Sequence, residues 1–234
     1  MGRARGPSST IPTMPVLQIS RQPDAMSWFD TLPGQPLLLA EQPGIQAALI
    51  ARPAQQPWLW IAPSTSALPD AAELPPRSVV LGRLGPQFAG SLRCGLPLPL
   101  PNESIGNIIL QHALDDGSDE LLDECERVLE PGGRLWLFTL NAWSPYRARW
   151  RRSGLVVRDV NAWHKRLRSI GLQPCGREVT HLGPVWRPSA DIAPSAAPDR
   201  LRAICLLETE KRTAALIPPA PVKSQWRPAG AAPA

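Results

Sequence analysis

His112 is the side chain that most clearly invites a catalytic interpretation in this chain of 234 residues. Together with Gln111 it follows an apolar run, residues 105–110, with the length and composition of a strand covered on both faces. The carboxyl ends of parallel strands form the crevice in which α/β proteins bind ligands. A histidine there could act as a general base with a pKa near neutrality, or it could be an ordinary residue at the edge of a loop.

Cysteine and histidine spacing supports neither a metal site nor a disulfide. The four cysteines are far apart and form no C-x-x-C pair, and Cys125 and Cys205 lie among apolar residues. This pattern is typical of buried free thiols in a reducing compartment. No apolar run approaches the length of a membrane span, and no signal-peptide core follows the first arginines. We therefore expect a cytoplasmic protein without a bound metal ion.

Charged side chains form two blocks of opposite sign. Residues 115–130 hold eight acids against one arginine, mostly on the expected solvent face of a helix. The segment between Arg147 and Arg168 holds seven arginines and a lysine against Asp159. With a net charge of +5, this segment could bind a phosphate-rich partner such as RNA or anionic lipid. The simpler interpretation is two solvated faces, which could also meet each other across a subunit contact.

The residues after His112 predict a strand–helix–strand unit, which is the repeating unit of a parallel α/β sheet. Ser118 is placed to cap a helix, and apolar residues at helical spacing give that helix one buried face. The sequence Pro131-Gly132-Gly133 is expected to end the helix and reverse the chain before a second buried strand. We expect five side chains of the two strands in the core: Ile108, Ile109, Leu135, Leu137 and Leu140.

Three segments of this region resemble the second half of class I S-adenosylmethionine-dependent methyltransferases of the type 11 group. They are LPLPNES before the first strand, RVLEPGGRLWL, and LNAWSPYRARW at the end of the second strand. A final helix (residues 161–170), a closing pair of strands and a terminal WRP extend the resemblance from about Trp28 to Arg227. The resemblance implies an α/β fold with a seven-stranded, mostly parallel Rossmann-like sheet of order 3-2-1-4-5-7-6. It also implies S-adenosylmethionine as the cofactor and a small molecule as the substrate.

The segment that aligns with the cofactor-binding turn of this family departs from the family pattern. In the family, a strand containing an acid runs into a turn of the form Gly-x-Gly-x-Gly, which allows positive φ and close approach of the ligand. Residues 58–66 align here without a gap, and Trp60 stands where the acid is expected. Pro63 removes one backbone N–H donor. Small residues other than glycine occupy the three glycine positions: Ala62, Ser64 and Ser66.

Two further positions of the implied cofactor site also lack an acid. Gly82 follows the second strand, where the family has an acid for the ribose hydroxyls, and Cys94 stands where an Asp lies near the adenine amine. Each lost hydrogen bond would weaken binding by about 1–3 kcal/mol, so S-adenosylmethionine binding is predicted to be weak or lost. Asp at positions 82 and 94, with glycines in the turn, is expected to strengthen it. The resemblance places these residues around the cofactor: Ala62, Ser64, Ser66, Gly82, Cys94, Gly95, Gln111 and His112.

Composition divides the chain into a folded region and loose ends. Residues 1–23 and 218–234 are predicted to be disordered, and residues 57–217 to form the methyltransferase-like domain. Residues 24–56 are predicted to form a helical lid, with a short helix starting at Asp24 or Ser27 and a second helix over residues 41–51. In the resembled family such helices cover the cofactor and help select the substrate. They could equally cap one face of the sheet.

Two functions from different classes follow. The first is methyl transfer from S-adenosylmethionine to a small molecule, for which the sequence assigns no catalytic residue. The alternative is a catalytically inactive descendant of the fold that serves as a binding or interaction module. Trp143 and Tyr146, which follow the second strand, are expected to pack against a proline-rich loop rather than to stack on a substrate.

Overall fold

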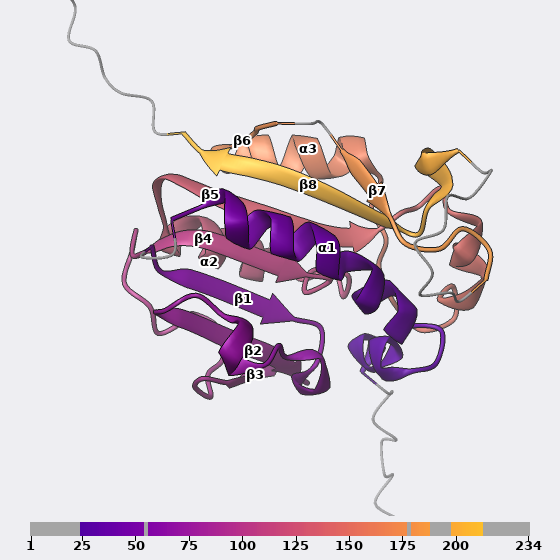
Figure 1. Ribbon diagram of the computed structural model, residues 1–234, viewed down its shortest axis with the longest axis horizontal. Coiled ribbons are helices and arrows are strands. Elements are labelled where there is room, and N and C mark those ends of the chain that lie inside the picture. The colour runs from indigo at the N-terminus through magenta and orange to yellow at the C-terminus, as the bar shows by residue number, and fades with distance from the viewer. Residues whose placement is uncertain (1–23, 54–55, 177–178, 188–197, 213–234) are drawn as a thin grey trace, which may run out of the picture.

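One eight-stranded sheet organises the computed structural model, which describes residues 24–53, 56–176, 179–187 and 198–212 (Figure 1). The two predicted disordered ends, residues 1–23 and 218–234, lie outside the described residues. The strand order is β3-β2-β1-β4-β5-β8-β6, and the short β7 also pairs with β8. The strands are β1 (Trp58–Ala62), β2 (Ser78–Leu84), β3 (Gln87–Gly90), β4 (Ile105–Gln111), β5 (Leu129–Leu140), β6 (Leu172–Pro174), β7 (Thr180–Leu182) and β8 (Ile204–Lys211).

The sheet is parallel in its centre and antiparallel at both sides. β1 pairs in parallel with β2 and β4, and β4 with β5, whereas β3, β6, β7 and β8 pair antiparallel. Gly85, with φ of 60°, and Pro86 form a two-residue hairpin loop between β2 and β3. A hairpin needs no crossover helix, so this side of the sheet carries little helical cover. β8 takes the place of the family's seventh strand, which confirms the order expected from the resemblance.

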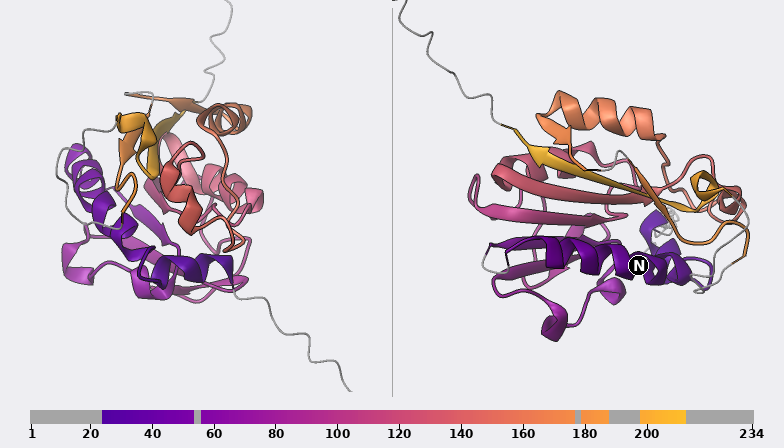
Figure 2. Two further views of the ribbon diagram at one scale, coloured as in Figure 1. Left: turned by 90° about the vertical axis from the view of Figure 1, so that its right-hand side faces the viewer. Right: turned by 45° about the horizontal axis from the view of Figure 1, so that its top comes forward.

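Helices cover both faces of the sheet (Figures 1 and 2). α1 (Gln35–Ala51) lies on one face with the short helix η1 (Ala25–Asp30), and α2 (Asp119–Val128) and α3 (Val160–Ser169) lie on the other. Short 3-10 helices complete the connections: η2 (Thr65–Ala67), η3 (Ala71–Glu73), η4 (Pro145–Arg149) and η5 (Asp199–Leu201). No helix among the described residues is long and apolar enough to cross a membrane.

The second half of the sheet matches its sequence-based prediction closely. All five predicted core side chains of β4 and β5 are fully buried, which confirms the expected core. Two details were wrong. α2 ends at Val128, and the Pro-Gly-Gly segment lies inside β5 instead of ending the helix. Ser118 occupies the N-cap position but makes no cap hydrogen bond, because its hydroxyl donates to Asp116 and accepts from Arg83.

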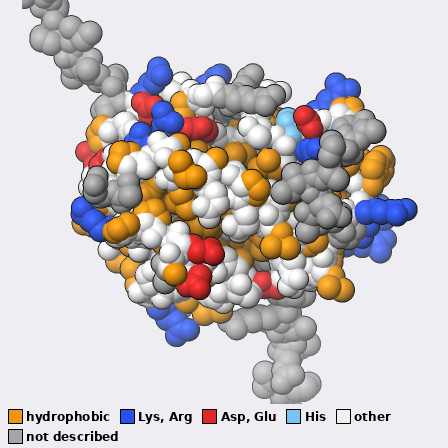
Figure 3. Space-filling view, in the orientation of Figure 1, with side chains coloured by type: hydrophobic (Ala, Val, Ile, Leu, Met, Phe, Trp, Pro, Cys, Tyr) orange, Lys and Arg blue, Asp and Glu red, His pale blue; other side chains and the backbone are white. Residues whose placement is uncertain are grey.

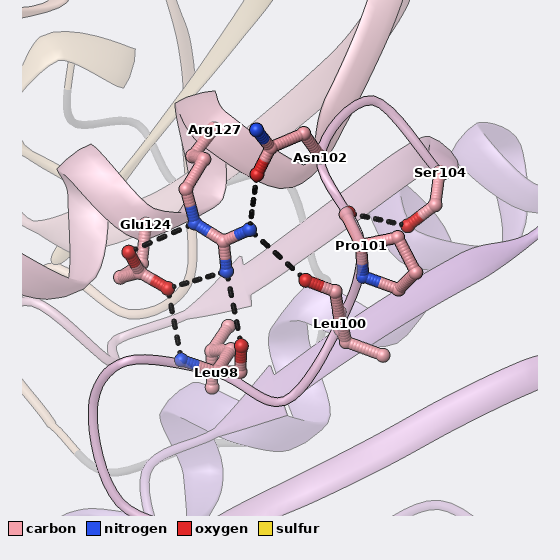
Figure 4. Close-up of polar contacts among 7 residues, drawn as sticks. All are labelled: Leu98, Leu100, Pro101, Asn102, Ser104, Glu124 and Arg127. Atoms are coloured by element: carbon pink, nitrogen blue, oxygen red, sulfur yellow. Dashed lines mark hydrogen bonds and ion pairs between the residues drawn. The ribbon is translucent and has the colours of Figure 1, made fainter.

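Arg127 links the LPLPNES segment to the RVLEPGG segment, two of the three segments that resemble the methyltransferase family (Figure 4). Its guanidinium donates to the carbonyl oxygens of Leu98 and Leu100, both at 3.0 Å, and to Asn102 Oδ1 at 2.6 Å. Glu124, one turn earlier on α2, accepts from Arg127 and from the Leu98 backbone N–H. These bonds fasten the loop before β4 to α2, so the LPLPNES and RVLEPGG segments form one structural unit.

Part of the basic block meets the acidic block within the chain. Arg158 Nη1 lies 2.5 Å from Asp119 Oδ1, and Arg166 pairs with Asp123. α2 and α3 lie on the same face of the sheet, which brings these side chains together. Asp115 is an exception among the acids of the block, because its side chain is fully buried.

Candidate functional site

The crevice at the carboxyl ends of β1 and β4 contains His112, but this histidine is sealed inside the protein. His112 follows β4 with a φ of 53°, a backbone conformation that few residues other than glycine adopt. Its backbone N–H donates to the Phe138 carbonyl at 2.9 Å, and its side chain is fully buried. The ring of Phe29, from η1, stacks on the imidazole with centroids 4.3 Å apart. The lid therefore packs into the crevice.

Two buried carboxylates hold the His112 ring from opposite sides. Nδ1 lies 2.7 Å from Asp115 Oδ2, and Nε2 lies 2.5 Å from Glu41 Oε1. Both carboxylates are fully buried. Glu41 comes from α1, where it is the single charged residue, so the lid helix contributes half of this arrangement. We call His112, Glu41 and Asp115 the buried triad.

Side chains and a backbone N–H of the neighbouring strands donate hydrogen bonds to both carboxylates of the buried triad. Asp115 accepts from the Thr139 hydroxyl at 2.5 Å and from the Leu140 N–H at 3.1 Å. Gln111 donates to Glu41 Oε2 at 2.7 Å and accepts from the Trp60 indole N–H at 3.2 Å. Trp60 stands where the resembled family has an acid, and here it supports a buried charge network. Such groups are tolerated away from water only when they are paired in this way.

The surroundings of His112 favour the protonated form of its ring, which cannot act as a general base. Burial is the largest influence and by itself lowers the pKa, but the charge of Glu41 and the hydrogen bonds with Asp115 and Glu41 outweigh it. The result is a pKa raised from 6.5 to about 9, so the ring is an imidazolium at neutral pH. A protonated, fully buried ring between two carboxylates has no free lone pair to accept a proton. Of the two interpretations that the sequence leaves open for His112, full burial between two carboxylates opposes the general base.

The turn after β1 is occupied by a side chain from the lid. Asp30, the last residue of η1, accepts hydrogen bonds through Oδ1 from the Ser64 hydroxyl at 2.7 Å and the Ser66 hydroxyl at 2.6 Å. The sequence argument missed Asp30, because nothing local links it to a turn more than thirty residues away. Ala62 is buried in the core beside this turn. Three of the predicted site residues are thus together, but they face the protein's own lid.

Gly82 serves the packing of this turn and leaves no room for an acid. A Cβ at this position would lie 2.6 Å from the Ser64 carbonyl oxygen and 2.6 Å from the Thr65 Cα. The turn therefore rests directly on β2, and Gly82 is the residue that permits this close approach. The expectation that Asp at position 82 would strengthen S-adenosylmethionine binding stays a prediction, and this steric conflict opposes it.

Cys94 and Gly95 lie apart from the other predicted site residues. Cys94 exchanges two backbone hydrogen bonds with Phe88 of β3, at 2.8 and 3.0 Å. Its side chain is half-buried and packs against the core on the α2 face, and burial raises the pKa of its thiol. Neither residue is among those that line the open cleft beside the turn.

That open cleft has a volume of about 920 Å³ and lies between η1, the turn after β1 and the β2–β3 hairpin. Asp24, Asp30 and the hydroxyls of Ser64 and Ser66 give it a polar wall. Arg83 also borders it, but this side chain pairs with Asp116 and donates to Ser118 at 2.7 Å. Among the described residues no cluster of metal-ligating side chains is found. The carboxylates and hydroxyls of the cleft can accept hydrogen bonds from a ligand.

The sequence matches no family model and no curated protein. Solved structures do match. A SAM-dependent methyltransferase from Thermotoga maritima is 15% identical, with a TM-score of 0.52 and 79% of this chain and 93% of that chain covered. The 1,6-didemethyltoxoflavin N1-methyltransferase of Burkholderia thailandensis, solved with S-adenosylhomocysteine, is 13% identical, with a TM-score of 0.52 and coverages of 80% and 84%. A SAM-dependent methyltransferase from Aquifex aeolicus is 11% identical, with a TM-score of 0.51 and coverages of 80% and 98%.

This chain has the class I S-adenosylmethionine-dependent methyltransferase fold. The residues at its crevice, however, do not fit the cofactor. Phe29 and the buried triad fill the space beyond β1 and β4, and the turn rests on Gly82, where an acid would be needed. The methyltransferase fold is therefore present with the space beyond β1 and β4 filled by the protein's own side chains, and an open cleft remains beside the turn.

Proposed function

We propose that this chain is a methyltransferase-fold binding protein that does not transfer methyl groups. The observation that carries the proposal is the insertion of Phe29 and Glu41 from the lid into the crevice, where they contact His112. The quoted loop and helix segments support a relationship with the type 11 group, and the free cysteines support a cytoplasmic location. The fold serves here as a scaffold for binding.

Opening the crevice to a ligand would cost free energy, because buried apolar side chains would become exposed. Admitting a ligand would expose Phe29, together with its neighbours Met26 and Trp28, which are all buried. Each large apolar side chain contributes about 2–3 kcal/mol when it is fully buried. Micromolar binding supplies only about 8 kcal/mol in total. Exposure of these side chains and separation of Glu41 from His112 would offset most of that free energy.

One observation favours methyl transfer as a second candidate. Asp30 and the serines Ser64 and Ser66 border the open cleft, so a carboxylate from the lid stands near the place where the family has one on its second strand. If S-adenosylmethionine binds in this cleft, Asp30 is the residue expected to accept hydrogen bonds from its ribose. The substrate in that case is a small molecule.

A thermal-shift titration with S-adenosylmethionine and S-adenosylhomocysteine tests the proposal. A ligand at one hundred times its dissociation constant adds about 2.7 kcal/mol to the stability. We expect no shift with either compound at about 1 mM. A shift that Asp30→Asn abolishes would overturn the proposal in favour of methyl transfer. Asp70→Asn, an exposed aspartate elsewhere on the chain, is the matched control.

A further inference from the structure

Two exposed tryptophans and four exposed arginines lie together beyond the carboxyl end of β5. Trp143 is 76% exposed and Trp186 is 66% exposed, which is unusual for such large apolar side chains. The Arg149 guanidinium donates to the Trp186 carbonyl oxygen at 3.4 Å, which joins the two loops that carry the tryptophans. We call this region the tryptophan–arginine surface: Trp143, Trp186, Arg147, Arg149, Arg151 and Arg152.

The four arginines of this surface are not neutralised by acidic side chains of the described residues. Farther along the basic segment, Arg158 and Arg166 are neutralised by acids of α2. None of the four arginines between positions 147 and 152 makes an ion pair with any residue in the part of the chain that the structure describes. Figure 3 shows basic side chains gathered at the right-hand edge, the end toward which β1 and β5 point in Figure 1. The local field is therefore positive.

The loop that carries Trp143 is fixed in place. The Asn141 amide donates to the carbonyl oxygens of Arg200 and Arg202 at 2.8 and 2.7 Å, and its oxygen accepts from the Trp143 N–H at 3.0 Å. Tyr146 is buried, and its hydroxyl donates to the Pro33 carbonyl at 2.8 Å. Trp143 is thus held outward on a rigid loop, which lowers the entropy lost when a partner stacks on it.

A cleft of about 700 Å³ continues the surface beside Trp143. Its wall carries two exposed cations, Lys165 and Arg200, against one acid, Asp159, so its formal charge is positive. The cleft lies beyond β5, apart from the crevice at β1 and β4. Binding at this surface therefore does not depend on whether the crevice binds S-adenosylmethionine.

We propose that the tryptophan–arginine surface binds single-stranded nucleic acid. Proteins that hold single strands combine a positively charged groove, which follows the phosphates, with aromatic side chains on which bases stack. Trp143 and Trp186 supply the stacking platforms, and Arg147, Arg151 and Arg152 supply the phosphate contacts. Arginine favours this partner further, because its planar guanidinium stacks on bases and forms paired hydrogen bonds with phosphate.

Fluorescence anisotropy with a labelled single-stranded RNA of about 20 nucleotides tests the proposal, since one site spans roughly 4–16 nucleotides. We expect binding that weakens with salt, with a slope of log affinity against log salt near roughly −2 for three phosphate contacts. Trp143→Ala with Trp186→Ala should weaken binding by about tenfold or more. Arg151→Gln with Arg152→Gln should lower the magnitude of the slope by roughly 1.4.

The matched control is Arg93→Gln with Arg212→Gln. It removes the same charge from exposed positions, and Arg212 follows the end of β8 that pairs with the start of β5. Binding that this control weakens as much as the Arg151 and Arg152 variant would show only nonspecific attraction and overturn the proposal. No binding to either RNA or single-stranded DNA would also overturn it. So would binding to phosphatidylserine vesicles without binding to RNA, because the surface would then be a lipid-binding one.

Discussion

The crevice and the tryptophan–arginine surface invert the usual placement of polar and apolar side chains. At the crevice, three ionisable side chains are fully buried with their partners, and aromatic rings close over them. Beyond β5, two tryptophans stand in solvent among arginines that have no acidic partner in the described part of the chain. The first region lies where the fold normally binds its ligand. The comparison teaches that the position of a site in a fold does not determine whether it is open.

Among the variants predicted here, removal of one member of the buried triad should lower the free energy of unfolding most. We expect Asp115→Ala to lower the free energy of unfolding by about 3–5 kcal/mol, because it leaves the His112 charge and the Thr139 hydroxyl without their buried partner. Urea denaturation measures this change. Asp70→Ala, on the surface, should change stability by less than about 0.5 kcal/mol. If Asp115→Ala lowered stability by no more than Asp70→Ala does, the triad would not be a closed structural network.

The charge on His112 predicts a specific pH dependence. Its pKa in the folded protein is about 9 against an ordinary value of 6.5, so the protonated ring stabilises the fold fully below pH 6.5. This contribution, roughly 3 kcal/mol, should be lost as the pH rises from 6.5 through 9. Urea denaturation between pH 6 and pH 10 measures it.

The control for this pH dependence is His112→Asn. Asparagine tolerates the positive φ of this position and does not titrate. The variant should lose most of the decline in stability, while the titration of other groups remains. An unchanged decline in the variant would mean that a different group produces it.

A side chain at position 82, beneath the turn after β1, should lower the stability moderately. Gly82→Asp is expected to lower stability by about 1–3 kcal/mol or more, because its side chain meets the Ser64 and Thr65 backbone. It should bring no gain in S-adenosylmethionine affinity by calorimetry. Gly95→Asp is the control, since a Cβ at Gly95 meets no atom within 4 Å. Micromolar binding by the Gly82→Asp protein would show that the turn moves readily off β2.

Replacement of the exposed Trp143 should change the stability least. We expect Trp143→Ala to change stability by less than about 0.5 kcal/mol, since its side chain is 76% exposed. Tyr146→Phe, a smaller chemical change, should cost about 1 kcal/mol because it removes the hydrogen bond to Pro33. Thermal denaturation of the two variants side by side tests this order. The reverse order would mean that Trp143 packs against the protein.

The contrast between these two residues also corrects one sequence-based expectation. Tyr146 does pack on the loop between η1 and α1, as predicted, whereas Trp143 does not. Both follow β5 within a short segment, and nothing in their local sequence separates them. Only the position of the lid, which reaches Tyr146 through Pro33, distinguishes the buried ring from the exposed one.

The buried triad could be anticipated only in part. Glu41 is the single charged residue in the apolar sequence of α1, and a lone acid in such a helix is a signal for a buried, paired group. Its partner could not be named, because seventy-one positions separate Glu41 from His112 and neither flanking sequence marks the other. Asp115 belongs to a segment whose acids were expected mostly on the solvent face, and its burial is an exception that no local signal marks.

Local sequence determined the β4–α2–β5 unit and its core residues, because apolar periodicity and turn residues act over a few positions. The strand order was expected only from the family resemblance. The tertiary structure alone decided the state of the crevice. Asp30 reaches Ser64 and Ser66, and Glu41 reaches His112, only after the lid has packed on the sheet. Ion pairs and ring stacking between distant segments depend on that packing, and so the closing of the crevice is a property of the assembled fold.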